Sequence, residues 1–515
     1  MNNPIYSYNG IPLIIPERYN PEENSFTILV GNNGVGKSRL LSGLSSELIE
    51  KYNLDLMYQE QLYTSYFAEM PKIITVSTSP FDTFKLPQRS GERYKADTSN
   101  YRYIGMRGNG LLGSGSISLI SSAATGLLDK LRNQQNFYRL AKIFEVLGFD
   151  PSLEFIFKPM FDVSKSPRNK KSLPEKIELL TPTFELIRDQ KTESTSSSFF
   201  ENIKNFKSET TRYTLPHAIR QSKYSALTTS VNRSYTSEVH NTEVKIGAAL
   251  DPKIQNSITS LPDSALEEIE TAIEAYSLYY IGKSNFRLRA SYDSVWNYRF
   301  DFGYGQHDIL LNAVRVLLQY GLIKLMDLKL SKPSNPDMSL RRASSGEQCM
   351  LVIMLGIAGH ITDFSKIFID EPEISLHPQW QEKFMALLIE VFSSYRGCNF
   401  FIATHSPQTI SRLHNENCFI TSLTKGEIYN AADFRARSAD FQLAELFDAP
   451  GIKNEYLIRL AFGIMSRVKR NKKTTNEDIS ELNKLVKLSK KIDSDDPLLE
   501  LISSVFEMIN FYAPN

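Results

Sequence analysis

An α/β fold with a partly helical insertion and a helical C-terminal tail is predicted for this chain of 515 residues. Apolar strands alternate with amphipathic helices in two regions, one beginning at Thr27–Val30 and the other spanning residues 340–420, which favours a layer of parallel strands. Residues 160–260, between them, are rich in Ser, Thr, Lys and Asn and show weak periodicity, as an insertion would. From Asp440 onward, the spacing of apolar residues predicts several helices.

The first region contains two predicted strands and two helical stretches. Thr27–Val30 is a short apolar strand followed by a glycine-rich loop, and Lys37–Glu50 has the spacing of an amphipathic helix. Lys72–Val76 is a second, β-branched strand that ends at a Ser-Pro turn signal. Residues 101–120 are rich in Gly and Ser, which predicts loops or hairpins, and helical spacing returns over residues 122–148.

Residues 264–420 contain further predicted helices and strands, which alternate most clearly over residues 340–420. Helices are predicted over Ser264–Tyr280, His307–Met326, Gly346–His360 and Pro378–Tyr395, and strands over Lys366–Ile369, Asn399–Ala403 and within the aromatic-rich Arg287–Phe302. We therefore expect four parts: residues 1–125 as the N-terminal part of a head, 126–300 as an inserted, mostly helical lobe, 301–430 as the C-terminal part of the head, and 431–515 as a helical C-terminal domain.

The composition excludes several classes of protein. The 59 Lys and Arg residues balance 58 Asp and Glu residues, so bulk charge does not favour a protein that coats nucleic acid. Cys349, Cys398 and Cys418 are too few and too scattered for a disulfide framework or a zinc site, which favours a reducing, cytoplasmic compartment. Because no signal pattern and no apolar run of about 18 residues is present, we expect neither secretion nor a membrane span.

A glycine-rich loop follows the first strand. Residues 31–38, Gly-Asn-Asn-Gly-Val-Gly-Lys-Ser, match the phosphate-binding pattern G-x-x-x-x-G-K-[ST]. The glycines let backbone N–H groups point at phosphate oxygens where a helix begins. Lys37 is expected to reach the β- and γ-phosphates, and the Ser38 hydroxyl is expected to ligate Mg²⁺. The predicted nucleotide contacts are Asn32, Asn33, Gly34, Val35, Gly36, Lys37, Ser38 and Arg39.

Two later strands carry polar residues at their ends. Lys366–Ile369 runs into Asp370 and Glu371, and beside a phosphate-binding loop Asp370 is expected to bind Mg²⁺ and Glu371 to act as the general base on water. Asn399–Ala403 is followed closely by His405, which at that position could contact the γ-phosphate. Apolar strands that end in acids are common, and an isolated histidine is more often structural. Only their combination with the phosphate-binding loop predicts a catalytic site.

Ser344, Ser345, Gly346 and Glu347 open the helix predicted over Gly346–His360. Locally, Ser344 and Glu347 form the pattern of a capping box. A helix N-terminus with small residues is equally a second anion site. Both interpretations stay open on these residues alone.

These four motifs, in this order, resemble the ATP-binding-cassette (ABC) ATPase head, in the branch that includes the structural-maintenance-of-chromosomes and RecF-like proteins. Ser344–Glu347 is similar to that family's signature motif, with Ser345 and Glu347 in place of the usual Gly and Gln, and His405 falls at its switch histidine. The resemblance implies an ABC-type P-loop head that hydrolyses ATP with Mg²⁺. It also implies a head-to-head homodimer in which the signature of one protomer covers the ATP of the other. The family's glutamine loop is not matched directly, because Ser77–Asp82 contains no glutamine and the next one is Gln88. Either Gln88 serves in that role or other contacts replace it, so the role stays unassigned.

Within this branch the chain resembles the PtuA ATPases of Septu-type and retron-associated antiphage systems. The resemblance rests on the chain length, on Ser77–Asp82, on Tyr103–Arg107, and on an insertion without heptads followed by a helical tail. It implies a regulatory subunit that controls an HNH-type nuclease, in retrons together with a reverse transcriptase and its RNA–DNA product.

Other functions fit less well. The sequence lacks the compact helical subdomain of a transporter ATPase and the heptads of a long-armed chromosome protein. Asp493–Asp496 lies between helical stretches, so we interpret it as a solvated loop or helix cap rather than as part of a nuclease site. A RecF-like, ATP-dependent DNA clamp in repair is the main alternative, with Arg168–Lys171 and Arg467–Lys473 gripping phosphates, although such basic stretches are more often solvated faces.

Overall fold

The computed structural model describes fifteen stretches of the chain. They are residues 4–59, 71–86, 100–107, 116–131, 134–159, 268–269, 271–272, 286–292, 298–300, 307–333, 335–374, 376–410, 413, 417–435 and 437–512. Gln88, Arg168–Lys171, most of Ser264–Tyr280 and most of the predicted insertion lie outside these residues.

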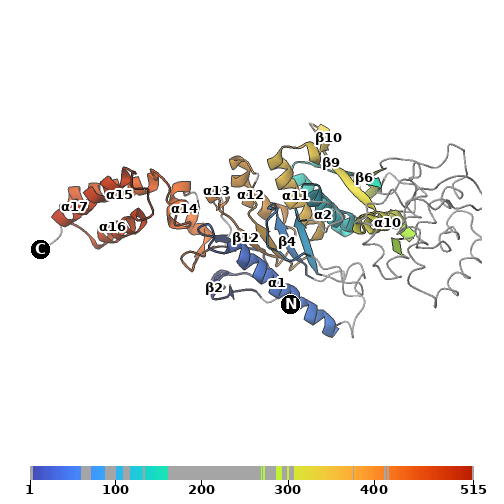
Figure 1. The fold of residues 1–515 in the computed structure, drawn as a ribbon, viewed down its shortest axis with the longest axis horizontal. Coiled ribbons are helices and arrows are strands. Elements are labelled where there is room, and N and C mark those ends of the chain that lie inside the picture. Colours follow the sequence, from blue (N-terminus) through green and yellow to red (C-terminus); the bar gives the residue numbers. More distant parts are fainter. Residues whose placement is uncertain are drawn as a thin grey trace, which may run out of the picture.

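A seven-stranded sheet forms the centre of the head (Figure 1). Its order is β14-β13-β3-β12-β11-β4-β5, and all neighbours are parallel except β13 and β14. The inner strands are continuous apolar runs, as in parallel sheets covered on both faces. The strands are β3 (Ser25–Val30), β4 (Ile73–Ser77), β5 (Tyr101–Gly105), β11 (Lys366–Asp370), β12 (Asn399–Ala403), β13 (Cys418–Ser422) and β14 (Glu427–Asn430).

Helices cover both faces of this sheet. Because successive strand residues point to opposite sides, Leu29 of β3 packs with the helix α1 (Lys37–Gln59), whereas Ile28 and Val30 pack with the helices on the other side. That other layer consists of α2 (Ser116–Lys130), α3 (Gln134–Val146), α11 (Ser345–His360) and α12 (Pro378–Val391). The carboxyl ends of the strands stay uncovered by these layers, so loops gather there.

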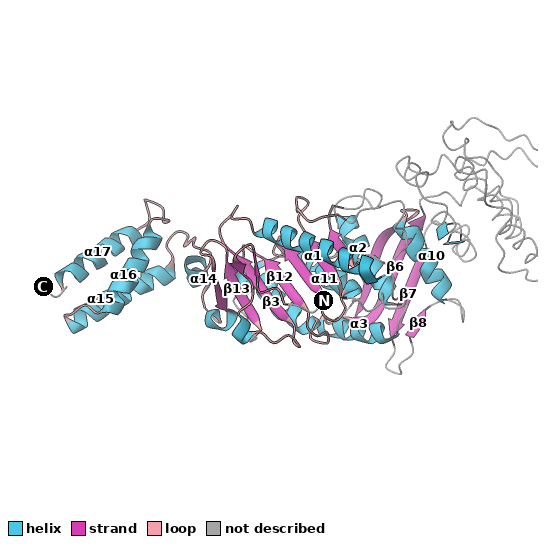
Figure 2. Cartoon of the chain, turned by 90° about the horizontal axis from the view of Figure 1, so that it is seen from below, coloured by secondary structure: helices cyan, strands magenta, loops and turns pink. Residues whose placement is uncertain are grey.

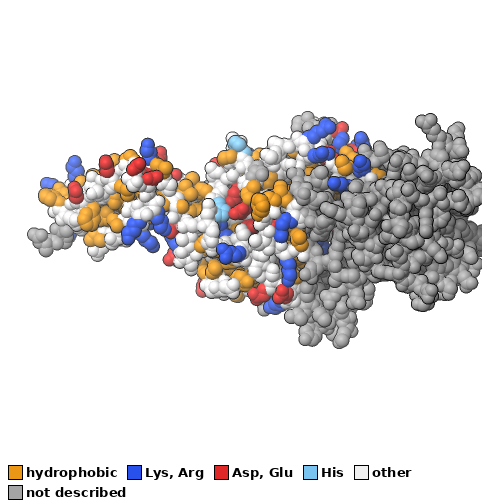
Figure 3. Space-filling view, in the orientation of Figure 1, with side chains coloured by type: hydrophobic (Ala, Val, Ile, Leu, Met, Phe, Trp, Pro, Cys, Tyr) orange, Lys and Arg blue, Asp and Glu red, His pale blue; other side chains and the backbone are white. Residues whose placement is uncertain are grey.

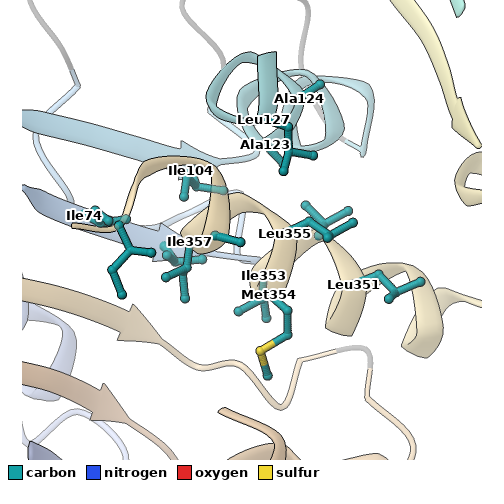
Figure 4. Packing of buried hydrophobic residues seen from close by; sticks show 14 of the residues in the cluster. Ile74, Ile104, Ala123, Ala124, Leu127, Leu351, Ile353, Met354, Leu355 and Ile357 are labelled. Carbon is teal, nitrogen blue, oxygen red and sulfur yellow. The ribbon is translucent and has the colours of Figure 1, made fainter. Parts of the chain in front are cut away.

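Helix α11 lies in the middle of the core and is apolar on every side. It packs closely against α2, and Figure 4 shows Ala123, Ala124 and Leu127 of α2 next to Leu355 of α11. Glycines allow this approach: a Cβ atom added at Gly359 of α11 would lie 2.6 Å from the backbone carbonyl carbon of Gly126 in α2. The helix that carries the signature-like residues is therefore held tightly to the head.

A second, five-stranded antiparallel sheet lies at one end of the head, away from the C-terminal helices (Figure 2). Its order is β10-β9-β6-β7-β8, and its apolar face joins the core of the head, where Phe155 and Leu328 pack with helix α10 (His307–Gln319). The strands are β6 (Asp150–Pro159), β7 (Phe286–Tyr292), β8 (Tyr298–Phe300), β9 (Ile323–Lys332) and β10 (Asn335–Ser339).

The C-terminal helices form a bundle at the opposite end (Figure 1). Helix α14 (Ala439–Glu445) leads from the head to α15 (Glu455–Asn471), α16 (Asn476–Ser489) and α17 (Leu498–Phe511), and these last three share a core of their own. The predicted loop Asp493–Asp496 joins α16 to α17, and the Asp496 carboxylate accepts a hydrogen bond from the Leu498 backbone N–H as α17 begins. The interpretation of these acids as a loop or cap is confirmed.

The remaining elements are short. They are the strands β1 (Ser7–Tyr8) and β2 (Ile11–Pro12), the helix α13 (Pro407–Ile410) and the 3-10 helices at Pro16–Arg18, Leu340–Arg342 and Ala431–Phe434.

The predicted α/β class and helical tail are confirmed, but two local predictions were wrong. The helix predicted over His307–Met326 ends at Gln319, because Gly321 adopts a φ of +73° and the chain then enters β9. Residues 101–120 contain β5 and the start of α2 rather than only loops or hairpins. The four-part division stays a prediction, and the second sheet draws strands from both sides of the boundary placed at residue 300.

Replacing Gly359 by alanine is expected to destabilise the fold by about 1–3 kcal/mol, because the new methyl group would press on the α2 backbone. Gly463→Ala in α15 is the matched control: the nearest atom to its Cβ would be Arg467 Nη1 at 3.5 Å, an ordinary contact. The control is expected to be neutral or to gain up to about 1 kcal/mol in helix propensity. Chemical denaturation measures both, and equal effects would contradict the close packing of α2 and α11.

Candidate functional site

Four strands of the central sheet end side by side, and the residues that follow them form the candidate site. Asp370, the last residue of β11, lies opposite Ser77 of β4 and Ala403 of β12. Ala403 in turn lies opposite Leu29 of β3. The four loops that leave these strands therefore start at one edge of the sheet, where α/β proteins bind their ligands.

The glycine-rich loop joins β3 to α1 and folds around the side chain of Lys37. The Lys37 ammonium donates hydrogen bonds to the carbonyl oxygens of Gly31 at 2.8 Å and Asn32 at 3.1 Å, and only 4% of the residue is exposed. Gly34 and Gly36 have φ values of +78° and +103°, which side chains rarely adopt. Burial lowers the pKa of Lys37, while Glu371, Glu373 and Asp370 oppose that shift, so a charged amine is held where phosphates would bind.

Ser38 and Asp370 meet at the start of α1. The Ser38 hydroxyl donates a hydrogen bond of 2.9 Å to Asp370 Oδ1. Burial raises the pKa of Asp370 to about 7, and the nearby charges of Glu371, Asp82 and Glu373 add to the shift. A divalent cation would relieve this concentration of carboxylates, and one hydroxyl beside one carboxylate suits Mg²⁺, which takes few protein ligands together with substrate phosphates. The residues present thus fit the predicted metal.

Among the described residues, no group of three or more His, Cys, Asp and Glu side chains is arranged to hold a metal ion by itself. The three cysteines are buried and free. No helix in the described part of the chain combines the length and apolarity of a transmembrane span.

Glu371 and His405 lie side by side next to Lys37. His405 Nε2 is 3.1 Å from Glu371 Oε1, and His405 Nδ1 is 3.3 Å from the Lys37 ammonium. Since an ammonium group only donates, Nδ1 accepts and the ring proton resides on Nε2, from which it is donated to Glu371. Burial and the Lys37 charge lower the pKa of His405, which keeps the ring neutral. Glu371 has a left-handed φ of +47°, a conformation that concentrates at functional sites.

Glu373 is a member of the site that the sequence analysis missed. One oxygen of its carboxylate accepts a hydrogen bond from the backbone N–H of His405, while the buried Oε2 atom has no hydrogen-bond partner among the described residues. Burial raises the pKa of this carboxyl group. Its place two residues after the predicted base was the only signal in the sequence, and its contact with the histidine loop depends on the fold.

The segment after β4 is fixed by an aspartate, a tyrosine and an arginine. The Asp82 carboxylate accepts hydrogen bonds from the Tyr103 hydroxyl at 2.7 Å and from Arg107 Nη2 at 2.6 Å. Thr83 accepts a hydrogen bond from Ser42 of α1 through its carbonyl oxygen. The two sequence segments used for the finer resemblance, Ser77–Asp82 and Tyr103–Arg107, are thus joined in one cluster beside the nucleotide edge.

The signature-like residues lie at the N-terminus of α11. Ser344 is the N-cap and accepts a hydrogen bond from the Glu347 backbone N–H at 3.3 Å, and Glu347 pairs with Lys332 of β9 at 3.4 Å. Ser344 and Ser345 are exposed, whereas Gly346 is buried. In the described part of the chain, the hydrogen bonds of Ser344 and Glu347 do not involve the glycine-rich loop. The Ser344 half of the predicted capping box is confirmed, and the role as an anion site stays a prediction.

Two comparisons with known proteins indicate an ATPase. The model of the AAA ATPase domain family matches residues 44–410. The chain is also similar to a protein of Escherichia coli described as a retron Ec83 probable ATPase, with 23% identity over 470 residues, which cover 86% of this chain and 74% of that protein.

Proposed function

Because this chain belongs to the AAA ATPase domain family and hydrolyses ATP, we propose that it is the ATP-dependent regulatory subunit of an antiphage complex. In this proposal two copies pair head to head on ATP, as in ABC-type ATPases, and the pairing controls a partner nuclease of the HNH type. The observation that carries the ATP-dependent part of the proposal is the arrangement of Lys37, His405 and Glu371 beside Ser38 and Asp370.

Nucleotide binding begins at the glycine-rich loop. The phosphates would take the place of the loop carbonyls as partners of the Lys37 ammonium, and the N–H groups at the start of α1 would face phosphate oxygens. Ser38 and Asp370 would hold Mg²⁺, which when bound neutralises charge on the β- and γ-phosphates. The loop and helix residues assigned to the nucleotide are Asn32, Asn33, Gly34, Val35, Gly36, Lys37, Ser38 and Arg39.

Hydrolysis needs a group that accepts a proton from water. Glu371 would take that proton as the water oxygen attacks the γ-phosphorus, and ADP leaves with the electrons of the broken bond. His405 would donate its Nε2 proton in a hydrogen bond to the γ-phosphate or to Glu371, because the Lys37 ammonium fixes the ring in this tautomer. Glu373 would keep the His405 backbone in place.

Pairing of two copies would complete the site. The exposed Ser344 and Ser345, at the start of α11, would cover the γ-phosphate of ATP held by the partner's loop, because a helix N-terminus attracts anions. Gly346 is buried and Glu347 is tied to Lys332, so α11 and β9 would move together when the pair closes. ATP hydrolysis would then reopen the dimer.

The defence context rests on the relative, whose name places it in a retron. For this chain we propose a nuclease subunit as the partner, and in a retron also a reverse transcriptase with its RNA–DNA product. Purification of the tagged protein from its native locus, followed by mass spectrometry and the ratio of absorbance at 260 and 280 nm, is expected to recover a nuclease. A lone ATPase dimer that gains DNA only when ATP is added would instead favour the repair clamp.

The repair clamp has one observation in its favour. Lys469, Arg470, Lys472 and Lys473, around the end of α15, are exposed. Arg467 of the same stretch is not available in this way, because it pairs with Asp478 and Glu481. We therefore keep the regulatory ATPase as the first proposal and the repair clamp as the second.

A further inference from the structure

The five-stranded sheet has one apolar face and one charged face. Along β6, Leu153, Phe155 and Phe157 are buried in the core, so Glu154, Ile156 and Lys158 point to the other side. The register places Arg289 and Lys329 opposite Glu154, and Arg287 and Asp327 opposite Ile156. The side chains of three neighbouring strands therefore share the outer face.

Cations dominate this outer face. Six of them, hereafter the basic face, come from the three strands and the turn that follows β10: Lys158, Arg287, Arg289, Lys324, Lys329 and Arg342. They accompany three carboxylates, Glu154, Asp327 and Asp337, in a chain whose overall net charge is only +1. Figure 3 shows Lys and Arg side chains gathered where β9 and β10 lie, with acidic side chains among them.

The carboxylates pair with part of the basic face: Lys329, with 22% of its side chain exposed, pairs with Asp337 at 3.3 Å. Glu154, with 6% of its side chain exposed, pairs with Arg287 at 3.3 Å and with Arg289 at 3.2 Å. The two arginine side chains nevertheless stay 66% and 52% exposed. Asp327 accepts hydrogen bonds from the Ser339 hydroxyl and the Arg341 backbone N–H, so its charge is directed to the turn before α11.

A cleft of about 850 Å³ opens on this face. Arg287, Lys329 and Arg342 line it together with Asp327, Asp337 and the hydroxyl groups of Ser339 and Ser344. Lys332 and Glu347 also line the cleft and pair with each other at 3.4 Å. Cations and hydroxyl donors along an open, polar cleft suit an extended anion better than an apolar ligand or an apolar protein surface.

We propose that the basic face binds the phosphate backbone of a nucleic acid strand. Arg287 and Arg289 are alternate residues of β7, about 6.6 Å apart, and Lys158 and Lys324 face each other on neighbouring strands, about 4.8 Å apart, so several cations are within reach of one extended anion. Arginine is suited to phosphate because its planar guanidinium group donates two parallel hydrogen bonds. The proposal is independent of nuclease control and of pairing, since every residue of the basic face belongs to one chain.

Binding at the basic face would also affect the residues proposed to act in the ATP cycle. The cleft reaches Ser344, the N-cap of α11, and the turn that carries Arg342 leads directly into that helix. A strand held in the cleft would therefore contact the residues proposed to cover the partner's ATP.

The test compares two variants with the same change in charge. The first combines Lys158→Gln, Lys324→Gln and Arg342→Gln on the basic face, and the control combines Lys51→Gln, Lys487→Gln and Lys490→Gln, three exposed lysines of α1 and of the end of α16. Binding of fluorescently labelled single-stranded DNA, single-stranded RNA and duplex DNA to the full chain without nucleotide is followed by anisotropy over a series of salt concentrations. Melting temperatures confirm that both variants are folded.

The basic-face variant is expected to bind about tenfold or more weakly than the unchanged chain. The slope of its affinity for duplex DNA against salt, both on logarithmic scales, is expected to become shallower by about 0.9 for each phosphate that is no longer neutralised. The control variant should bind as the unchanged chain does. Equal losses of affinity in both variants, full affinity in the basic-face variant, or no binding of any of the three probes by the unchanged chain would overturn the proposal. Capture of an acidic protein with no nucleic acid binding would overturn it as well.

Discussion

Replacing Lys37 by alanine is expected to abolish ATP binding and, with it, hydrolysis. The Lys37 ammonium is the cation enclosed by the glycine-rich loop, where it is 4% exposed and donates to the carbonyl oxygens of Gly31 and Asn32. The variant also removes the donor that fixes the tautomer of His405. Loss of a charged donor to phosphate in a buried site corresponds to about 2–5 kcal/mol, or a loss of about thirtyfold or more in affinity.

Calorimetric titration with ATP and Mg²⁺ measures this directly. Lys51→Ala is the matched control, because Lys51 lies on the same helix, α1, and is exposed. The control is expected to bind ATP as the unchanged chain does. Undiminished ATP binding by Lys37→Ala would show that the glycine-rich loop does not bind the nucleotide.

Replacing Glu371 by glutamine is expected to stop turnover while ATP binding persists. A general base commonly contributes about 10²–10⁴-fold to the rate, and glutamine cannot accept the proton from water. The geometry should survive, because a glutamine oxygen still accepts the hydrogen bond from His405 Nε2 and because both residues tolerate the left-handed backbone of position 371 equally poorly. The loss should therefore appear in kcat rather than in affinity.

Phosphate release under single-turnover conditions is the appropriate measurement, because it separates chemistry from product release. Glu390→Gln on α12 provides the control, since this exposed glutamate lies outside the nucleotide site. It is expected to leave both rate and affinity unchanged. If Glu371→Gln hydrolysed ATP at the original rate, the general base would have to be sought elsewhere, with Glu373 the next carboxylate to test.

The central sheet and the motifs could be predicted because their signals are local. Each site residue lies at the end of an apolar strand or in the loop after it: Lys37 at the end of the glycine-rich loop after β3, Asp370 at the end of β11 and His405 after β12. A parallel sheet then aligns the strand ends, so three short patterns far apart in the chain predicted one site.

The five-stranded sheet was much harder to predict. Leu322 and Leu325 are three residues apart, and a bulge in the pairing of β6 with β9 interrupts the alternation, so the start of β9 has the apolar spacing of a helix. Its partners in β6 and β7 are distant in the chain. The basic face follows from this pairing and could not be seen in a sequence whose positive and negative charges balance.

Contacts between loops also escaped prediction. Glu373 holds the backbone of His405, and Asp82 joins Tyr103 to Arg107, yet none of these residues has a local pattern that announces its partner. Contacts of this kind depend on how the strands bring the loops together, so a local sequence pattern does not predict them.

ATP-dependent pairing is the central claim, and the molecular mass of the Glu371→Gln variant tests it most directly. Light scattering should give 58.7 kDa without nucleotide and twice that mass with ATP and Mg²⁺. Adding Ser345→Arg to this variant should leave ATP binding intact and keep the mass at that of one chain, because Ser345 is exposed at the start of α11, where the partner's ATP would lie. A mass that stays at one chain with ATP bound, or a dimer that Ser345→Arg does not affect, would contradict the account.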